Sequence, residues 1–168
     1  GKTLQYHYDN NYDVSGATEY GSGKIYHTYI RPEFRAGLVY KLDDWSSVKA
    51  NFTHNTQFIQ IANNSDSGSP LDLWFPASPN IKPQEANQYS VGYFRNFKEN
   101  TIETSVEFYY KGMKNVIDFK DNAQILFNEK LDGDIRTGKG KSYGMEIMVK
   151  KNTGRLTGFV NYTGSSLI

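Results

Sequence analysis

Three glutamates stand at positions where paired carboxylates raise the question of acid–base catalysis. Glu103 and Glu107 fall on the polar side of one predicted strand, and Glu146 falls on the polar side of another. General acid–base catalysis needs such groups within hydrogen-bond reach of the proton that they move. No nucleophile, base and orienting group can be assembled around these glutamates, so we predict that the chain is not an enzyme. We interpret the three side chains as charges that pair across strands or line a water-filled space.

Two other motifs begin like ligand-binding sequences but do not complete them. Residues 16–24 end in Gly-Ser-Gly-Lys, but Ile25 follows where a phosphate-binding loop needs Ser or Thr, and no helix pattern follows. Asp132-Gly133-Asp134 offers two carboxylates, whereas calcium takes about six to eight oxygen ligands, so we predict a turn there. Cysteine is absent, and the histidines are few and scattered, at positions His7, His27 and His54. We therefore expect neither a metal nor a cofactor.

The composition favours strands with one apolar and one polar face. The chain has 168 residues, 13 Tyr, 10 Phe and a mean hydropathy of −0.66. A disordered chain would be poor in aromatic residues. Transmembrane barrels combine a polar interior with aromatic girdles. No apolar run of about 18 residues is present, so no spanning helix is expected. A formal net charge of +1 without a basic stripe predicts no nucleic-acid partner.

Alternation with period two runs through most of the chain. It predicts six strands, at 33–41, 48–57, 88–97, 101–111, 142–150 and 155–163. On one face we predict an apolar set made of Val48, Phe52, Ile102, Val106, Phe108, Met145, Ile147 and Val160. On the other face we predict polar residues, which would face the lumen of a barrel, at Lys49, Asn51, Glu103, Glu107 and Glu146.

The connections between these strands alternate in length. Those at 42–46, 98–100 and 151–154 are short, whereas residues 62–87 and 112–141, and the N-terminal stretch 9–26, read as long polar loops. Short periplasmic turns and long extracellular loops are typical of outer-membrane barrels. One-sided alternation also builds soluble sandwiches with a polar outer face. The fold class is therefore predicted as all-β, an antiparallel up-and-down meander that forms part of a large transmembrane β-barrel.

Several segments resemble TonB-dependent receptors of the Bacteroidota type. Residues 68–84, with the Asn80-Ile81-Lys82-Pro83 entry to a strand, are similar to a long loop of that family, although Gln84 replaces the usual Glu. Further similar segments lie at 92–97, 107–115, 140–146 and 158–163. The resemblance implies a barrel of about 22 strands closed by an N-terminal plug. It also implies an outer-membrane location and nutrient import driven by the TonB complex.

The resemblance places residues 1–168 in a single partial β-barrel domain. Gly1 is expected to follow a cut, and the chain carries no plug, no TonB box and no terminal aromatic residue. The implied partners are outer-membrane lipid, the rest of the same barrel and its plug, the TonB complex through the missing N-terminal part, and a nutrient of unknown identity. The first and last strands are expected to remain edges within this chain, because six strands are too few to close such a barrel.

Two aromatic loop residues, Trp74 and Phe75, are possible ligand contacts, with packing inside a folded loop as the alternative. A different functional class also stays open at this point, a soluble β-sheet module that binds carbohydrate or another ligand at a cell surface. A barrel enzyme is a third class, but it needs a cluster of acids and histidine at one rim, which the sequence does not offer.

Overall fold

The computed structural model describes residues 2–25, 27–62, 73–120, 123, 128 and 130–168. These residues form β-strands and one short 3-10 helix, η1 (Leu131–Asp134). Within the part of the chain described, no helix has the length and apolar character needed to cross a membrane. The chain divides into two compact units. Unit 1 comprises residues 1–32, 56–85 and 114–139, and unit 2 comprises residues 33–55, 86–113 and 140–168.

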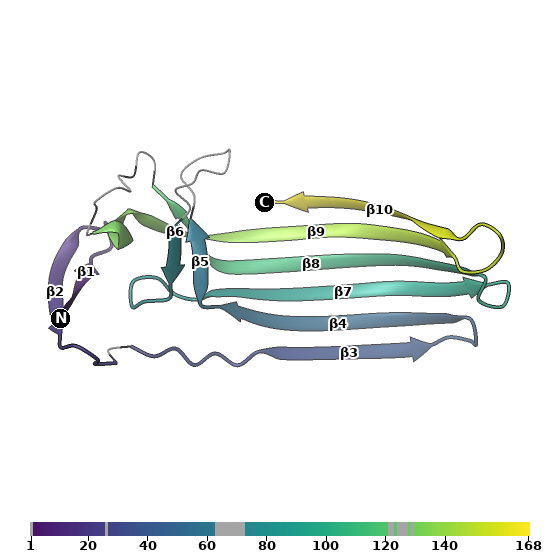
Figure 1. Ribbon diagram of the computed structural model, residues 1–168, viewed down its shortest axis with the longest axis horizontal. Helices are drawn as coiled ribbons and strands as arrows, with labels where there is room; N and C mark the ends of the chain where they lie inside the picture. The colour runs from purple at the N-terminus through teal and green to yellow at the C-terminus, as the bar shows by residue number, and fades with distance from the viewer. Residues whose placement is uncertain (1, 26, 63–72, 121–122, 124–127, 129) are drawn as a thin grey trace. The chain divides into compact units, whose positions relative to one another are not determined.

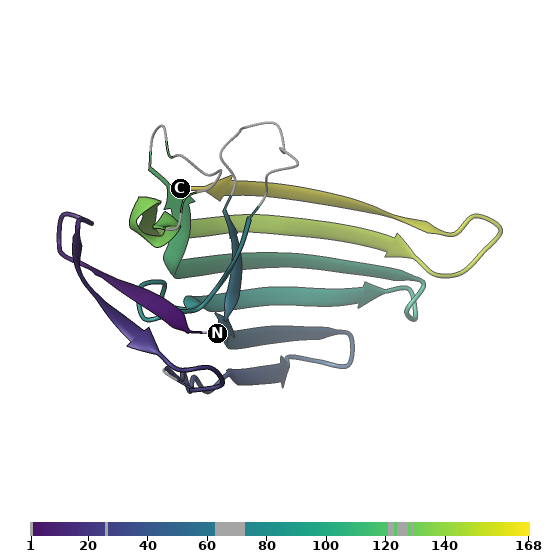
Figure 2. The same ribbon diagram turned by 60° about the vertical axis from the view of Figure 1, so that its left-hand side comes forward.

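Unit 2 carries most of a six-stranded antiparallel sheet. Its strands follow the order β10-β9-β8-β7-β4-β3, so each main strand lies beside the next one along the chain (Figure 1). The predicted up-and-down meander is confirmed. The same order is visible from a second direction in Figure 2. The bounds are β3 (Phe34–Lys41), β4 (Ser46–Gln57), β7 (Gln84–Phe97), β8 (Ile102–Phe119), β9 (Ile135–Lys151) and β10 (Gly158–Leu167).

Strands β3 and β10 are the two edges of this sheet. β3 pairs with β4, β10 pairs with β9, and the described strands do not close on themselves. The short connections β3–β4, β7–β8 and β9–β10 all lie at one end of the sheet (Figure 1). An open sheet with edges at its first and last strands is what a segment of a larger barrel presents, because closure needs further strands.

The register assigns each residue of unit 2 to one of two faces. Val160 lies opposite Val149 and Tyr162 opposite Ile147, whereas Thr163 lies opposite Glu146. Directly opposed residues point to the same side of a sheet, and side chains alternate along each strand. The pair β3–β4 follows the same rule, with Tyr40 opposite Val48, Leu38 opposite Ala50 and Ala36 opposite Phe52. Across the middle of the sheet, Phe52 contacts Tyr89 on one face, whereas Glu107 lies over Gly92 and Glu103 approaches Lys150 on the other. The apolar set therefore gathers on one face, as predicted.

This apolar face is not covered by a second sheet in unit 2. None of the eight residues predicted for it is buried, and Val160 and Phe108 are 73% and 51% exposed. Large aliphatic and aromatic side chains elsewhere on the same face are also exposed, among them Leu38, Tyr40, Tyr89, Tyr143 and Tyr162. A contiguous apolar surface of this kind needs an apolar environment, because water contact with it is unfavourable. The outcome argues against the soluble sandwich, whose apolar face would be buried.

Most of the strand boundaries differ from those predicted; β7 begins at Gln84 instead of residue 88, and β10 ends at Leu167 instead of residue 163. β8 runs to Phe119 and β9 begins at Ile135, so the connection predicted at 112–141 is reduced to residues 120–134. Asn115 has a φ of 56° inside β8, which interrupts the alternation that the prediction followed. β10 begins at Gly158 instead of residue 155, because Gly158 opposite Lys151 is the first pair of the ladder.

Unit 1 contains two hairpins that were not predicted from the sequence. Residues 14–20 and 73–76 were predicted to lie in loops, which was wrong. β1 (Thr3–Tyr8) pairs with β2 (Val14–Tyr20), and β5 (Ile59–Ala62) pairs with β6 (Leu73–Pro76). Each strand is short and gains its stability from packing that a local pattern does not reveal. The core of unit 1 draws on the loops and on the ends of β8 and β9, and its buried residues are Ala62, Phe75, Ile81, Ile117, Phe119, Ala123 and Ile135.

Candidate functional site

The tip of the β1–β2 hairpin in unit 1 is held by one carboxylate. Asp9 Oδ1 accepts hydrogen bonds from the backbone N–H groups of Asn11 (2.8 Å) and Asp13 (2.9 Å). A short acidic side chain commonly stabilises a turn in this way. Tyr12 takes a φ of 65° at the same tip, and its N–H donates to the Asp9 carbonyl at 3.0 Å. The turn therefore presents Asn10 and Tyr12 in a defined geometry.

Tyr8 attaches this hairpin to the segment that contains η1. Its hydroxyl donates to the Lys130 carbonyl at 3.2 Å, and its ring lies against Gly133. Partial burial, and then the negative charge of Asp132, raise the pKa of the Tyr8 phenol above its usual value. The phenol thus stays protonated at neutral pH and remains a donor.

Asn80 joins three parts of unit 1 at one point. Its Nδ2 donates to the Tyr6 carbonyl of β1 (3.0 Å) and to Asp132 Oδ2 of η1 (3.1 Å). The backbone around it is a tight turn in which Ser78 and Ile81 exchange two hydrogen bonds of 2.9 and 3.1 Å. Ile81 is 2% exposed and anchors this turn in the core. The position of Asn80 is therefore set by packing beneath it.

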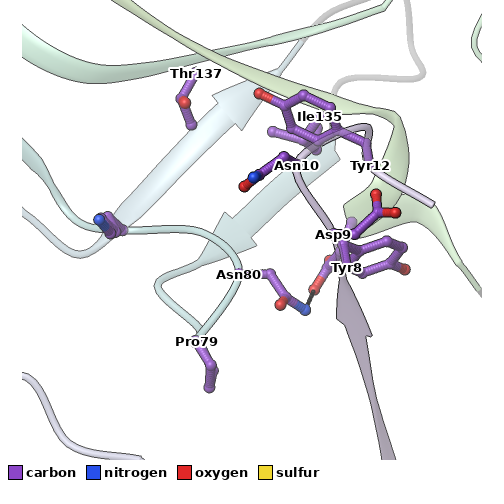
Figure 3. A pocket seen from close by; sticks show the side chains of 10 residues that line it. Tyr8, Asp9, Asn10, Tyr12, Pro79, Asn80, Ile135 and Thr137 are labelled. Atoms are coloured by element: carbon purple, nitrogen blue, oxygen red, sulfur yellow. Dashed lines mark hydrogen bonds between the residues drawn. The ribbon is translucent and has the colours of Figure 1, made fainter. Parts of the chain in front are cut away.

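These elements surround a cavity of about 430 Å³. Figure 3 shows Asn10 and Tyr12 of the hairpin, Asn80 of the β6–β7 connection, and Ile135 and Thr137 of β9 around this space. The remaining lining residues are Tyr8, Asp9, Pro79, Lys82 and Asp132. Small-molecule sites commonly have volumes between about 300 and 1,000 Å³, so the cavity has the size of a ligand site.

A second set of contacts fixes the position of Tyr12 at the cavity. The Arg136 guanidinium lies over the Tyr12 ring, with 3.8 Å between Cζ and the ring centroid. Arg136 also donates from Nη1 to the carbonyls of Gly133 (2.8 Å) and Ile135 (3.1 Å). A stacked guanidinium with fixed hydrogen bonds holds an aromatic ring in one orientation. Tyr12 is thereby positioned from β9, although it belongs to the hairpin.

The lining can bind a polar ligand, and it offers no assembled catalytic set. Asp9 and Asp132 are acceptors, Lys82 is a donor, and Asn10, Asn80 and Thr137 both donate and accept. Among the described residues, no group of three His, Cys, Asp or Glu is placed to hold a metal ion. The lining can therefore offer a ligand hydrogen bonds, charge pairs and contacts with aromatic rings.

The two aromatic residues predicted as ligand contacts lie on opposite sides of the β5–β6 hairpin. Phe75 is 6% exposed and meets Phe119 edge-to-face at 5.8 Å, so it packs inside the loop core. Trp74 is 66% exposed and lies opposite Ile61 in the hairpin. In this structure Phe75 takes the packing role that was the alternative to ligand contact. Neither residue lines the cavity described above.

The predicted lumen-facing residues lie in unit 2, apart from the cavity, and the first two lie on β4. Asn51 Nδ2 donates to Ser90 Oγ of β7 at 3.4 Å. Lys49 Nζ lies 4.0 Å from the Phe94 ring centroid on the same strand β7. These contacts place Lys49 and Asn51 on the face opposite the apolar set.

The three glutamates continue this polar face across the sheet. A Cβ on Gly92 of β7 would come within 2.7 Å of Glu107 Cγ, so Glu107 lies over that glycine. Glu103 Oε2 lies 3.8 Å from Lys150 Nζ of β9, and Glu146 shares its side of β9 with Lys150. The structure thus brings all five residues to one face, and whether that face borders a lumen stays a prediction.

The sequence reading missed the cavity residues for a definable reason. Only the Asp/Asn-rich run from Asp9 to Asp13 and the Asp132-Gly133-Asp134 turn carried local signals, and both indicated turns. The cavity arises where these turns meet the 79–82 segment, and no local pattern predicts that meeting.

Residues 3–166 match the family described as TonB dependent receptor-like, beta-barrel. The chain belongs to this family. TonB-dependent receptor barrels are outer-membrane proteins, so the sheet of unit 2 is part of an outer-membrane barrel. This membership overturns the alternative of a soluble ligand-binding module.

Three solved structures share the fold of this TonB-dependent receptor chain. The first is FpvAI in its complex with pyocin S2, with a TM-score of 0.57 and 16% identity over 80% of this chain. The second is the alcaligin outer-membrane receptor FauA from Bordetella pertussis, with a TM-score of 0.56 and 17% identity over 90% of this chain. The third is the ferric-catecholate import receptor Fiu from E. coli K12 in its closed form, with a TM-score of 0.52 and 18% identity over 90% of this chain. The chain spans 17%, 25% and 19% of those chains, respectively. No curated protein matches it. Two of the three, FauA and Fiu, are described as receptors.

Proposed function

We propose that this chain supplies barrel wall and extracellular loops to a TonB-dependent receptor that imports a scarce nutrient. The observation that supports this proposal is that the two units differ in kind. Unit 2 has one exposed apolar face and one polar face, as a wall between lipid and a wet interior requires. Unit 1 folds the longer connections around a polar cavity of ligand size.

The cavity of unit 1 is the proposed ligand contact. Asn10, Lys82 and Thr137 line it and make no side-chain hydrogen bond or ion pair with other described residues, so their polar atoms are available to a ligand. Trp74 is a second proposed contact because of its exposure. Lys49, Asn51, Glu103, Glu107 and Glu146 are proposed to face the lumen, on the side where the plug would sit.

The wider assignments rest on the family and on the motifs. We propose that residues 1–168 are one partial barrel domain and that a plug, further strands and a TonB-interacting segment belong to the same receptor. The run at 68–84 supports a receptor of the Bacteroidota type. A purely transporting and binding role, without catalysis, fits a lining that lacks an assembled nucleophile and base.

The proposal is tested by deleting the gene of the full receptor and, separately, the gene for TonB. Growth is compared under limiting iron, under limiting cobalamin, and on complex carbohydrate or peptide as the sole carbon source. We expect both deletions to fail under the same one of these conditions. Normal growth of the receptor deletion wherever TonB is needed would contradict the import function.

Two point variants then test the cavity under the condition found. Asn10→Ala and Lys82→Gln each remove one polar group from the lining, and each is expected to slow uptake about fivefold or more, the equivalent of one lost hydrogen bond to a charged or polar ligand. Lys24→Gln is the matched control, because Lys24 is exposed in the same unit and outside the lining. Uptake equal to wild type in both cavity variants would place the ligand contacts elsewhere.

A further inference from the structure

Unit 2 contains an apolar groove beside the β9–β10 connection. It has a volume of about 360 Å³ and is lined by Val149, Lys151, Leu156, Val160 and residues 157–159. Leu156 and Val160 are 77% and 73% exposed, so the groove is open. Nearly all of its wall is apolar, and Lys151 contributes the one charged side chain of the lining.

Lys151 lies on the lipid-facing side of the sheet. Its neighbour Lys150 approaches Glu103 on the polar face, so alternation turns Lys151 to the apolar face with Val149. The Lys151 ammonium folds toward the connection, since its Nζ lies 3.6 Å from the Cβ position of Gly154. Among the residues that the structure describes, no acidic oxygen lies within 4.0 Å of this ammonium.

The groove sits at a membrane boundary. The β9–β10 connection shares its end of the sheet with the two other short turns (Figure 1), and short turns mark the periplasmic rim of outer-membrane barrels. At such a rim, lysine side chains extend from the hydrocarbon toward the headgroups. The apolar wall would border acyl chains, and the ammonium would lie at the level of the lipid phosphates.

We propose that this groove is a binding site for one anionic phospholipid of the periplasm-facing leaflet. The acyl chain lies along Val149, Leu156 and Val160, and the headgroup phosphate pairs with Lys151. Lipid is the occupant because the groove opens on the face that lipid covers, and an anionic headgroup complements an ammonium without a protein partner. The inference rests on the outer-membrane location and is independent of the imported nutrient.

The test uses the full receptor, purified in detergent and supplied with equal amounts of phosphatidylglycerol and phosphatidylcholine. Retained lipid is counted by native mass spectrometry. We expect wild type to retain phosphatidylglycerol in preference, and Lys151→Gln to lower its occupancy about fivefold, which is the contribution of one lysine near an anionic lipid surface. Lys151→Arg should keep the occupancy, and Leu156→Asn should reduce retention of both lipids.

The control is Lys98→Gln. Lys98 is an exposed lysine in the β7–β8 turn at the same rim, but it does not line the groove. Its substitution should leave phosphatidylglycerol occupancy unchanged. Equal occupancy in wild type and Lys151→Gln, equal loss in Lys98→Gln, or equal retention of the two lipids by wild type would each overturn the proposal. Nutrient uptake by Lys151→Gln should match wild type, so the two proposals can fail separately.

Discussion

The ring of Tyr8 occupies the space that a side chain on Gly133 would fill. A Cβ at Gly133 would come within 2.5 Å of Tyr8 Cε1, closer than real Cβ contacts. The two residues belong to different elements of unit 1, the β1–β2 hairpin and η1. Their close approach lets the Tyr8 hydroxyl reach the Lys130 carbonyl and closes one side of the cavity.

We therefore expect Gly133→Ala to loosen the hairpin from η1. Overpacking of this kind costs about 1–3 kcal/mol, because the ring or the backbone has to shift. The measurement is limited proteolysis of the full receptor, followed as the rate of cleavage in the β1–β2 region. Gly16→Ala serves as control, since nothing lies within 4 Å of its Cβ position. Identical cleavage rates in the two variants would show that the Tyr8–Gly133 contact does not hold the hairpin.

A pH dependence follows from the raised pKa of Tyr8. Burial, and then the charge of Asp132, favour the neutral Tyr8 phenol in the folded protein. The stability that the neutral phenol contributes is therefore complete below the usual tyrosine pKa of about 10, and it is lost as the pH rises through the higher pKa of the folded protein. The phenolate absorbance of wild type minus that of Tyr8→Phe should titrate with a midpoint above 10. A midpoint at or below 10 would mean that the phenol is not shielded as the structure indicates.

The two faces of β9 should differ in their tolerance of charge. Ile147 and Glu146 are neighbours on β9, opposite Tyr162 and Thr163 of β10, and they point to opposite faces. An arginine on the lipid side near the bilayer midplane costs roughly 2–4 kcal/mol. Ile147→Arg is therefore expected to lower the unfolding free energy in lipid vesicles by about that amount.

Glu146→Arg provides the matched comparison on the polar face. It removes the hydrogen bond from Asn161 Nδ2 to Glu146 Oε1 (2.6 Å), but the new charge remains in a polar setting. The expected loss is about 1 kcal/mol, the net worth of one hydrogen bond. A larger loss for Glu146→Arg than for Ile147→Arg would reverse the assignment of the faces.

The β3–β4 turn should respond to acid through Asp43. The Trp45 backbone N–H donates to Asp43 Oδ1 at 2.8 Å, and this bond, with the Ser46 hydroxyl next, lowers the pKa of the carboxyl. Because the pKa of Asp43 is lower in the folded protein, the ionised carboxylate stabilises the turn fully above the usual aspartate pKa of about 3.9. This stabilisation is lost as the pH falls through the pKa of the folded protein. The fluorescence of Trp45, measured as the emission of wild type minus that of Trp45→Phe, should change with pH with a midpoint below pH 3.9. Asp43→Asn should abolish that transition, and its persistence in Asp43→Asn would assign it to another group.

Local pattern alone was enough to specify the wall of unit 2. Alternation placed six strands, their sequential order and both faces, because the side of a sheet to which a residue points depends only on its position along the strand. The polar grouping of Lys49, Asn51, Glu103, Glu107 and Glu146 followed from the same rule. The lengths of the connections gave the sheet a direction, since short turns and long loops are properties of sequence spacing.

The cavity and the loop core required the folded structure. Asn80 contacts Tyr6 and Asp132, and Tyr8 contacts Lys130 and Gly133, all across long separations in the chain. Such contacts carry a loop-closure cost that only the assembled core of Ile81, Phe75 and their neighbours offsets, so no short segment encodes them. The division between exposed Trp74 and buried Phe75 has the same origin. A two-residue alternation separates their faces, but only packing against Phe119 decides which face is covered.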